Sequence, residues 1–363
     1  MAPRRGGGGG RPPRDKGVAL DPRARLTGLV QAIRGRRSAV VLTHDNPDPD
    51  GIGSALALRY LLDRWAGIPV VIAHGGTVGR SENRAMLRLL RVKAVPAIHV
   101  DYRRHDLVCV VDAQPSTGYV SLPEGVRVDV LFDHHPAREA PAAATFAEID
   151  PAAGSTCTLL GEMMLANGVP VREELATALV YGMKAETLDL GRETHPRDEA
   201  VYTALYALAN KRLLSRIVTE RVPRAWFGAF SRALARARLH GTVVASDLGE
   251  IPVADLVPEM ADLLLRLKDA RWSCVMGSVG RRLHVSVRAA EASMGADRIL
   301  RRAMRGMGSS GGHGSMAGGQ IELHALSPEE TATLRREFLQ GFLRALRIRD
   351  RTGTLLVPDG GSA

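Results

Sequence analysis

Residues 43–54 concentrate side chains that can hold a divalent metal ion. Their sequence, THDNPDPDGIGS, places His44, Asp48 and Asp50 directly after the apolar run 39–42. Carboxylates held close together repel each other unless a cation lies between them. The spacing therefore predicts part of a metal site in a loop that follows a strand.

Two further apolar runs end in the same residue types. Asp112 follows the run 107–111. The run 128–132 is followed by three such residues: Asp133, His134 and His135. Because the carboxyl ends of parallel strands meet at one edge of a sheet, all three segments are expected to contribute to one site. Taken singly, each residue has an ordinary interpretation as a turn residue, helix cap or surface histidine, but three equivalent strand ends favour the metal site.

The donor set also indicates the metal and the reaction. Imidazole and carboxylate ligands without thiolate suit Mn²⁺, with Mg²⁺ or Fe²⁺ as substitutes, better than a structural zinc ion. Two such ions can share a hydroxide and neutralise charge as it attacks phosphorus in line. This chemistry needs no Ser, Cys or Lys nucleophile, so it favours direct hydrolysis of a phosphoester.

The elements around these residues alternate between strand and helix. Strand patterns lie at 38–43, 69–73, 107–111, 128–132 and 145–149, with helical patterns at 54–65 and 83–90 between the first of them and at 155–167 and 173–183 after the last. This alternation predicts an α/β fold with a doubly wound, mainly parallel sheet. Gly51 and Gly53 are expected to permit a tight turn before the first of these helices, whose amino end would favour a bound phosphate.

The chain is expected to fold as two domains with flexible ends. The predicted divisions are a basic Gly-rich tail at 1–23, a catalytic domain at 24–195, a helical connector at 196–239, a smaller α/β domain at 240–348 and a flexible end at 349–363. The active site is expected in the cleft between the domains.

The smaller domain carries the Gly-rich segment 308–319. One interpretation is a flexible loop of low complexity, and the other is a loop whose backbone N–H groups bind an anion. The second is favoured because a helix and a strand bracket the segment, and His313 and Ser315 add donors to the glycines Gly311 and Gly312. Arg288, at the end of a predicted strand, can bind a phosphate at the same loop.

Composition excludes several classes of protein. No apolar run approaches the ~20 residues that span a bilayer, so no membrane partner is expected. The three cysteines, Cys109, Cys157 and Cys274, are far apart, which predicts buried free thiols and a cytoplasmic location. The net charge of +10 has two open interpretations, solvated helix faces or steering of phosphate-bearing substrates. The sequence also allows a homodimer.

Together these motifs resemble the DHH phosphoesterase family, and within it the two-domain nanoRNase-type branch that degrades very short oligonucleotides. The resemblance covers about residues 24–348 and rests on HDNPDPDGIGS at 44–54, Asp112, FDHH at 132–135 and SGGHGSMAGG at 310–319. It implies two ions, usually manganese. His44 and Asp48 would hold one ion, Asp50 and His134 the other, and Asp112 would bridge them.

The resemblance also implies roles around the metals and in the second domain. Asp112, His134, His135 and Asp133 would be the catalytic residues, with His135 facing the substrate phosphate and Asp133 orienting the imidazoles. The DHH-associated domain would bind the terminal nucleotide through Arg288 and the loop that contains His313.

One position departs from the family pattern. The family has a further Asp ligand in a Thr-Asp-Thr-like element, and Glu186 stands at the corresponding place. Glu186 is expected to ligate the second ion, although its longer side chain would shift that ion. Lys184 could instead pair with Glu186, and Asp189 is an alternative ligand.

The expected function is hydrolysis of phosphodiester bonds in short oligonucleotides, with exonuclease character, and of 3′-phosphoadenosine 5′-phosphate as a further substrate. The alternatives are a cyclic dinucleotide phosphodiesterase and a nucleotide-binding regulator with a weakened metal site. Inorganic pyrophosphatase is less favoured. An aromatic content of 4% argues against a long stacking platform for extended single strands.

Overall fold

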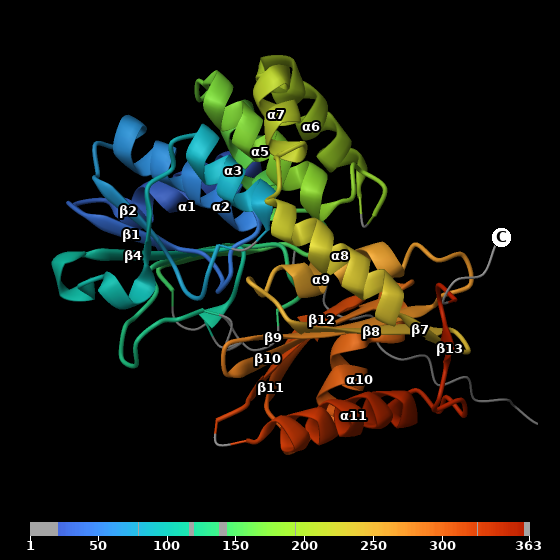
Figure 1. Ribbon diagram of the computed structural model, residues 1–363. Coiled ribbons are helices and arrows are strands. Elements are labelled where there is room, and N and C mark those ends of the chain that lie inside the picture. The colour runs from blue at the N-terminus through green and yellow to red at the C-terminus, as the bar shows by residue number, and fades with distance from the viewer. Residues whose placement is uncertain are drawn as a thin grey trace, which may run out of the picture. The chain divides into compact units, whose positions relative to one another are not determined.

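The chain divides into two compact units, Met1–Glu220 and Arg221–Ala363 (Figure 1). The computed structural model describes residues 21–78, 80–115, 120–137, 144–192, 194–324 and 326–358. Most of the predicted basic tail therefore lies outside the described residues, but its last two positions begin helix α1. The predicted cleft between the domains stays a prediction, and each unit is described below by itself.

Unit 1 contains a six-stranded sheet in which every pair of neighbouring strands is parallel. Its strands are β1 (Ala39–Leu42), β2 (Val70–His74), β3 (Ala94–Pro96), β4 (Leu107–Val111), β5 (Val130–Asp133) and β6 (Phe146–Ile149). Their order in the sheet is β3-β2-β1-β4-β5-β6. The α/β fold with a parallel sheet is confirmed, and β3 is a strand that the sequence did not predict.

The strand order reverses between β1 and β4. The chain adds β2 and β3 on one side of β1, and then β4, β5 and β6 on the other. In open parallel sheets such a reversal leaves a crevice at the carboxyl ends of the two central strands, where ligands bind. The residues that follow β1 and β4 are therefore placed at the position where the topology itself provides a site.

The two faces of this sheet are covered differently. Alternate residues of the central strands, such as Val41 and Cys109, pack into a large core formed with the helices. The helices of this unit are α1 (Pro22–Ile33), α2 (Pro49–Arg59), α3 (Ser81–Leu89), α4 (Thr156–Ala166), α5 (Glu173–Glu186), α6 (Pro196–Leu208) and α7 (Lys211–Val218). The intervening residues of the same strands, such as Val40 and Val110, pack on the other face into a smaller core with Ala97, Val120 and Val128. Burial on both faces explains why β1 and β4 are continuous apolar runs.

Helix α2 begins earlier than predicted. It starts at Pro49, with Asp48 as N-cap, so Asp50 and both glycines of the motif lie in the helix rather than in a turn before it. One carboxylate oxygen of Asp48 accepts hydrogen bonds from the backbone N–H groups of Asp50 and Gly51 at 2.9 and 3.0 Å. Proline at the first helical position and aspartate at the N-cap are both strong start signals. The helix continues as a π-helical segment, Tyr60–Trp65.

Close helix packing holds the first turn of α2 in place. A Cβ atom added to Gly182 of α5 would lie 2.5 Å from Cys157 Sγ and 3.0 Å from the carbonyl oxygen of Pro49. It would also lie 3.2 Å from the Cα atom of Asp50. Only glycine lets α5 approach α2 and α4 so closely, so Gly182 contributes directly to the position of Asp50.

Unit 2 contains a seven-stranded mixed sheet in the order β11-β12-β10-β9-β8-β7-β13. Its strands are β7 (Arg238–His240), β8 (Val243–Glu250), β9 (Trp272–Val279), β10 (Arg282–Ala289), β11 (Ser309–His313), β12 (Met316–Glu322) and β13 (Thr354–Leu355). Its helices are α8 (Arg224–Arg236), α9 (Leu256–Leu264), α10 (Ala296–Ala303) and α11 (Pro328–Ala345). Among these strands β8 and β9 pair in parallel, and β9 and β10 form an antiparallel hairpin. β13 pairs with β7 within the segment that was predicted to be a flexible end.

The Gly-rich segment is a hairpin rather than a loop. β11 and β12 pair antiparallel from Ser309↔Gln320 to His313↔Met316. Gly312 has φ 147°, and a Cβ atom there would lie 2.3 Å from the carbonyl oxygen of Met316, so this pairing requires glycine. The prediction of an open loop is wrong because strand pairing outweighs the weak strand preference of glycine.

The helices predicted as a connector divide between the units, since α6 and α7 belong to unit 1 and α8 to unit 2. All three cysteines are buried and free, as predicted. In the described part of the chain, no helix is both long enough and apolar enough to cross a bilayer.

The Gly182 contact yields a testable prediction. Gly182→Ala should lower the free energy of unfolding by about 1–3 kcal/mol, because the added methyl group overpacks the contact of α5 with α2 and α4. Urea denaturation measures the loss. The control is Gly228→Ala in α8, where the new Cβ atom would lie 3.7 Å from the nearest heavy atom and stability should not fall. Equal stability of both variants would contradict the proposed role of Gly182.

Candidate metal centre

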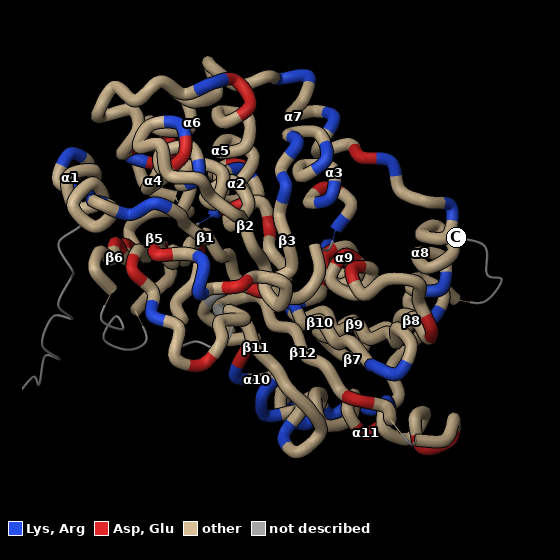
Figure 2. The backbone as a smooth tube through the Cα atoms, turned by 90° about the vertical axis from the view of Figure 1, so that its left-hand side faces the viewer, with Lys and Arg blue, Asp and Glu red and all other residues tan. Residues whose placement is uncertain are grey.

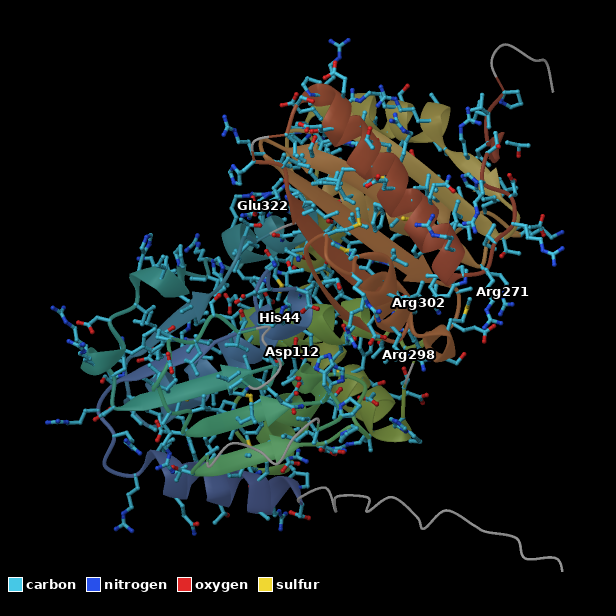
Figure 3. All side chains as sticks on the ribbon, turned by 90° about the horizontal axis from the view of Figure 1, so that it is seen from below. His44, Asp112, Arg271, Arg298, Arg302 and Glu322 are labelled. Carbon is cyan, nitrogen blue, oxygen red and sulfur yellow. The ribbon has the colours of Figure 1, made fainter. Side chains whose placement is uncertain are left out.

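The predicted ligands meet at the carboxyl edge of the parallel sheet in unit 1. His44 follows β1, Asp112 follows β4, and His134 follows β5. Figure 3 shows His44 and Asp112 beside each other, and His44 Nε2 lies 3.7 Å from Asp112 Oδ2. The sheet thus brings together residues that are up to 90 positions apart in the chain.

Asp112 lies between two imidazoles. Its Oδ2 faces His44, and its Oδ1 lies 3.7 Å from His134 Nε2. Two groups of residues have potential ligand atoms within 4.8 Å of one another. They are His44, Asp48 and Asp112 in one group and Asp112, His134 and His135 in the other. Asp112 is common to both, which is the position that a bridging carboxylate requires.

The two imidazoles present the atom that a metal needs. The Nδ1–H group of His44 donates to the carbonyl oxygen of Asp45 at 2.9 Å, and that of His134 donates to the carbonyl of Ala153 at 3.3 Å. A carbonyl only accepts, so each neutral ring carries its lone pair on Nε2, toward Asp112. Among the described residues, His134 Nε2 is buried without any hydrogen-bond partner. An unsatisfied buried acceptor beside carboxylates fits a divalent cation.

The carboxylates are too crowded to remain fully charged without cations. Burial, followed by the negative charges of Asp50, Asp48, Asp133 and Glu186, raises the pKa of Asp112 well above its usual value. Only 3% of Asp112 is exposed. A proton or a metal ion must therefore compensate its charge, and metal binding would displace the proton.

His44 and Asp48 compensate each other in part. Burial opposes the charged imidazolium, but the carboxylate of Asp48 outweighs this effect and raises the pKa of His44 to about 9. Burial also opposes the charged Asp48 carboxylate, while His44 lowers the pKa of Asp48. Their closest atoms, His44 Nε2 and Asp48 Oδ1, are 3.6 Å apart. A metal ion bound here would replace the proton on His44.

Asp50 is held by the amino end of helix α4. Its two carboxylate oxygens accept hydrogen bonds from the backbone N–H groups of Thr156 and Cys157, each at 2.8 Å. These N–H groups belong to the first turn of the helix and have no partner within it, and the helix dipole favours a negative charge at this end. Asp50 Oδ2 lies 3.9 Å from His134 Nε2, so the predicted pair is adjacent.

Thr156 is a residue that the sequence analysis missed. Its hydroxyl donates to Asp112 Oδ1 at 2.9 Å, and it is fully buried. Helix α4 thus contacts both Asp50 and Asp112. The one local signal was Ser155, an N-cap residue at the start of this helix, which indicates the helix end but not what it faces.

Asp133 orients only one of the two neighbouring histidines. Asp133 Oδ1 accepts from His135 Nδ1 at 2.8 Å, and its Oδ2 accepts from Gln114 Nε2 at 2.7 Å. His134 is oriented instead by the carbonyl of Ala153. Burial opposes ionisation of both partners, but their mutual attraction lowers the pKa of Asp133 and raises that of His135. His135 is the more exposed partner, at 32% of its side chain.

Glu186, the last residue of α5, lies close to the carboxylates without joining either ligand group. Burial and the charges of Asp48 and Asp50 raise its pKa, which places it near the cluster electrostatically. Its Oε1 is 3.6 Å from Arg192 Nη2. The expectation that Lys184 could pair with it is wrong, because Lys184 Nζ pairs with Asp189 Oδ2 at 2.7 Å. That ion pair, with Asp189 62% exposed, also turns Asp189 away from a ligand role.

The predicted phosphate-binding residues of unit 2 have other contacts. Arg288 is buried, and its Nε pairs with Asp262 Oδ1 at 2.5 Å while Nη1 donates to Ser286 Oγ at 2.8 Å. Gly311 and Gly312 pair with Gly318 and Ala317 in the hairpin. Ser315 lies in the turn that joins the two strands, and its carbonyl accepts from Ala289 N at 2.8 Å. The side chain of His313 lies outside the described part of the structure.

Asp112 also has an unusual backbone conformation. Its φ is 60°, in the left-handed region that a residue with a side chain rarely adopts. Its N–H group donates to the carbonyl of Phe132 at 2.8 Å, which ties it to the strand that carries the histidines. Such strain concentrates at functional sites, where the surrounding structure maintains it.

Comparison with known proteins places the chain in context. Residues 38–183 match the model of the DHH family, N-terminal domain. An uncharacterized protein of Methanocaldococcus jannaschii, MJ1633, is 28% identical over 333 residues, which cover 91% of this chain and 68% of the relative. A probable manganese-dependent inorganic pyrophosphatase of Streptococcus agalactiae is 30% identical over 177 residues, 48% of this chain and 56% of the relative.

Solved structures share the fold. An exopolyphosphatase-related protein from Bacteroides fragilis superposes with a TM-score of 0.72 at 15% identity, over 91% of this chain and 99% of the other. RecJ from Thermus thermophilus, solved with Mn²⁺, has a TM-score of 0.51 at 17% identity, over 93% of this chain and 56% of RecJ. At these identities the likeness establishes the fold alone.

The contact of Thr156 with Asp112 predicts an effect on metal binding. Thr156→Val keeps the shape but removes the hydroxyl, and a hydrogen bond to a charged group contributes about 1.5–3 kcal/mol. Mn²⁺ binding, measured by titration calorimetry, should therefore weaken by roughly 10- to 100-fold. Thr27→Val on the exposed face of α1 is the control, because its hydroxyl bonds only to the carbonyl of Arg23. Equal affinity in both variants would exclude a role of Thr156 in positioning Asp112.

Proposed function

We propose that this chain, whose residues 38–183 form a DHH family domain, is a metal-dependent phosphoesterase that hydrolyses phosphodiester bonds of short oligonucleotides. The observation that carries the proposal is the position of Asp112 between two ligand groups. A carboxylate shared in this way is the arrangement that a pair of divalent ions uses in phosphoryl-transfer sites.

The ligand roles proposed here are those that the family resemblance implies, and the short distances from Asp112 to His44 and His134 support them. His44 and Asp48 would hold one ion, Asp50 and His134 the other, and Asp112 both, with Glu186 as a further ligand of the second ion. Two bound ions, Mn²⁺ or its substitutes Mg²⁺ and Fe²⁺, would lower the pKa of a water molecule and neutralise charge on the phosphate. Manganese is favoured because the donor set mixes imidazole and carboxylate and includes no thiolate.

His135 is the residue proposed to face the substrate. The carboxylate of Asp133 fixes its Nδ1 side and raises its pKa, so the ring carries a positive charge over a wider pH range than an isolated histidine. A charged imidazolium donates a strong hydrogen bond to a phosphate oxygen. Gln114 donates to the other oxygen of Asp133, so both oxygens of this carboxylate accept a hydrogen bond, which helps to fix the position of Asp133 beside His135.

The buried thiol near the site argues against a covalent mechanism. Burial, followed by the charge of Asp50, raises the pKa of Cys157 well above its usual value. Since the thiolate is the nucleophilic form, Cys157 is inert at neutral pH. Its role is packing against the glycines of α2 and α5. Water is therefore the proposed nucleophile.

The length of the substrate remains part of the proposal. The low aromatic content offers few surfaces on which successive bases could stack, which favours a short substrate. Arg288 and the hairpin around Gly312 and Ser315 are proposed to contact its terminal nucleotide. 3′-Phosphoadenosine 5′-phosphate and cyclic dinucleotides present the same phosphate chemistry in a similarly small molecule.

Inorganic pyrophosphate is the second candidate substrate. It is favoured by the 30% identity to the streptococcal protein that is named a probable manganese-dependent inorganic pyrophosphatase. That alignment covers only 48% of this chain and 56% of the streptococcal protein, so it supports this candidate for only part of the chain. A nucleotide-binding regulator is the alternative outside enzymes, motivated by Glu186 in place of aspartate.

A substrate panel tests the proposal. With Mn²⁺, the purified protein should hydrolyse a dinucleotide faster than pyrophosphate, and Asp112→Ala should reduce the rate by at least about 100-fold, since even residues that only orient metal ligands cost 10–100-fold. The variant should fold as stably as the parent without metal, because it removes a carboxylate from a crowded cluster. Pyrophosphate as the preferred substrate would select the second candidate, and binding without turnover in any divalent metal would reject the enzyme.

Glu186 provides a separate test of the second ion. Glu186→Gln should reduce the number of tightly bound Mn²⁺ ions from two to one, counted by calorimetry and by elemental analysis of the dialysed protein. The matched control is Asp189→Asn, whose carboxylate pairs with Lys184 and should not affect the count. Two ions in both variants would show that Glu186 is no ligand.

A further inference from the structure

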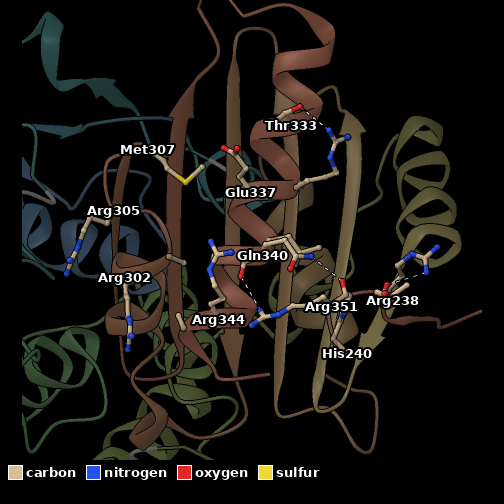
Figure 4. Close-up of a pocket in the computed structure, with 16 residues that line it drawn as sticks. Arg238, His240, Arg302, Arg305, Met307, Thr333, Glu337, Gln340, Arg344 and Arg351 are labelled. Carbon is tan, nitrogen blue, oxygen red and sulfur yellow. Dashed lines mark hydrogen bonds between the residues drawn. The ribbon is translucent and has the colours of Figure 1, made fainter. Parts of the chain in front are cut away.

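Unit 2 carries a basic groove that has no part in the proposed chemistry. The groove has a volume of about 1140 Å³ and is lined by residues of β7, of α10 and the segment after it, of α11 and of the segment before β13. Figure 4 shows Arg302 and Arg305 on one side of α11 and Arg238 and Arg351 on the other. Small-molecule sites usually enclose about 300–1,000 Å³, so this groove suits a larger, extended ligand.

The lining is strongly positive. Glu337 is its one acidic residue. Six arginines face it: Arg238, Arg302, Arg305, Arg336, Arg344 and Arg351. Figure 2 shows basic positions along both α10 and α11. Like charges gathered in this way repel each other, so an anion bound among them would stabilise the unit.

Most of this charge is uncompensated. Within the described residues, the side chains of Arg302, Arg305 and Arg344 have neither a hydrogen bond nor an ion pair. The other three bond to neutral groups. Arg238 donates to the carbonyl of Gly353 at 3.0 Å, Arg351 to that of Gln340 at 3.3 Å, and Arg336 to the hydroxyl of Thr333 at 2.9 Å. Elsewhere in unit 2, Arg282, Arg288 and Arg335 all pair with carboxylates.

The arrangement of the arginines suits a chain of phosphates. Arg336 and Arg344 are eight residues apart on α11, which corresponds to about 12 Å along the helix axis. Arg302 and Arg305 extend the positive surface away from α11 (Figure 4). A single compact anion cannot reach arginines spread over this distance, whereas a polymer with regularly spaced phosphates can. Guanidinium groups bind phosphate oxygens in pairs, which favours arginine over lysine for this task.

The lining also indicates which part of a nucleic acid would be bound. It includes no Phe, Tyr or Trp, so it offers no surface for base stacking. Its apolar residues, Met307 and Leu339 among them, are aliphatic. Contacts to phosphates carry no sequence information, so binding would be independent of base sequence.

We propose that this groove binds the sugar-phosphate backbone of a single-stranded oligonucleotide, as a site separate from the metal centre. The choice of a nucleic acid among polyanions rests on the proposed function, because a longer strand carries the same sugar-phosphate backbone as the proposed short substrate. The groove would hold such a strand by its charge alone.

Binding of a fluorescent 16-nucleotide strand tests the proposal in EDTA, which prevents cleavage. The combined variant Arg302→Ala, Arg336→Ala and Arg344→Ala should bind at least tenfold more weakly. Its slope of log K against log salt should fall by about 2, since each phosphate contact of a single strand contributes about 0.7. The single variant Arg344→Glu should weaken binding as well, and serves if the combined variant does not fold by circular dichroism.

The matched control carries three alanines at exposed arginines outside the groove: Arg103, Arg212 and Arg281. It loses the same charge and should bind like the parent. Equal weakening of both combined variants would reduce the effect to net charge and overturn the proposal. Binding of inorganic polyphosphate without binding of the 16-nucleotide strand would also overturn it.

Dinucleotide hydrolysis measured on the parent protein separates this proposal from the proposed function. If the parent binds the strand through the groove arginines but hydrolyses no dinucleotide, the groove stands and the proposed function fails. If the parent hydrolyses dinucleotides and the combined groove variant binds the strand normally, the proposed function stands and the groove proposal fails.

Discussion

The repulsion among buried carboxylates is the constraint on which unit 1 depends. Asp50, Asp112 and Asp133 are each at most 3% exposed, and Asp48 and Glu186 act on them through their charges. A protein interior does not stabilise such a cluster unless each charge meets a proton, a hydrogen-bond donor or a cation. A different group lies beside each carboxylate. Helix amides donate to Asp50, His135 and Gln114 donate to Asp133, and His44 lies beside Asp48. Asp112 accepts from the hydroxyl of Thr156 and is the residue proposed to bridge the cations.

The fold makes this arrangement possible because strand ends, helix amino ends and a close contact between helices all meet at one edge of the sheet. The reversal of strand order places the ends of β1 and β4 side by side. Helix α2 begins directly at the sheet edge and helix α4 directs its first amides toward Asp50. The close contact at Gly182 keeps both helices at the distance these hydrogen bonds need. Thus the packing of α5 directly against the first turn of α2 helps to determine the position of Asp50.

The sequence revealed the parts of the site that lie next to a regular pattern. His44, Asp112 and His134 could be predicted because each follows an apolar strand, and parallel strands end together. Thr156 and Gln114 could not, since their partners are 44 and 19 positions away and nothing local marks the contact. The hairpin of β11 and β12 was missed for a different reason. Glycines carry no periodic side-chain signal, so only the pairing itself distinguishes a strand of glycines from a loop.

The hydrogen bonds from α4 to Asp50 affect how long an ion would stay bound at the candidate metal centre. Proteins open locally, and helix ends open more readily than sheet cores. When the first turn of α4 unwinds, Asp50 loses both amide partners and Asp112 loses the hydroxyl of Thr156 in the same event. The residence time of an ion would then be set by the fraying of one helix end as much as by the ligands. Unwinding of this first turn would therefore weaken the hold on Asp50 and Asp112 together and favour release of a bound ion.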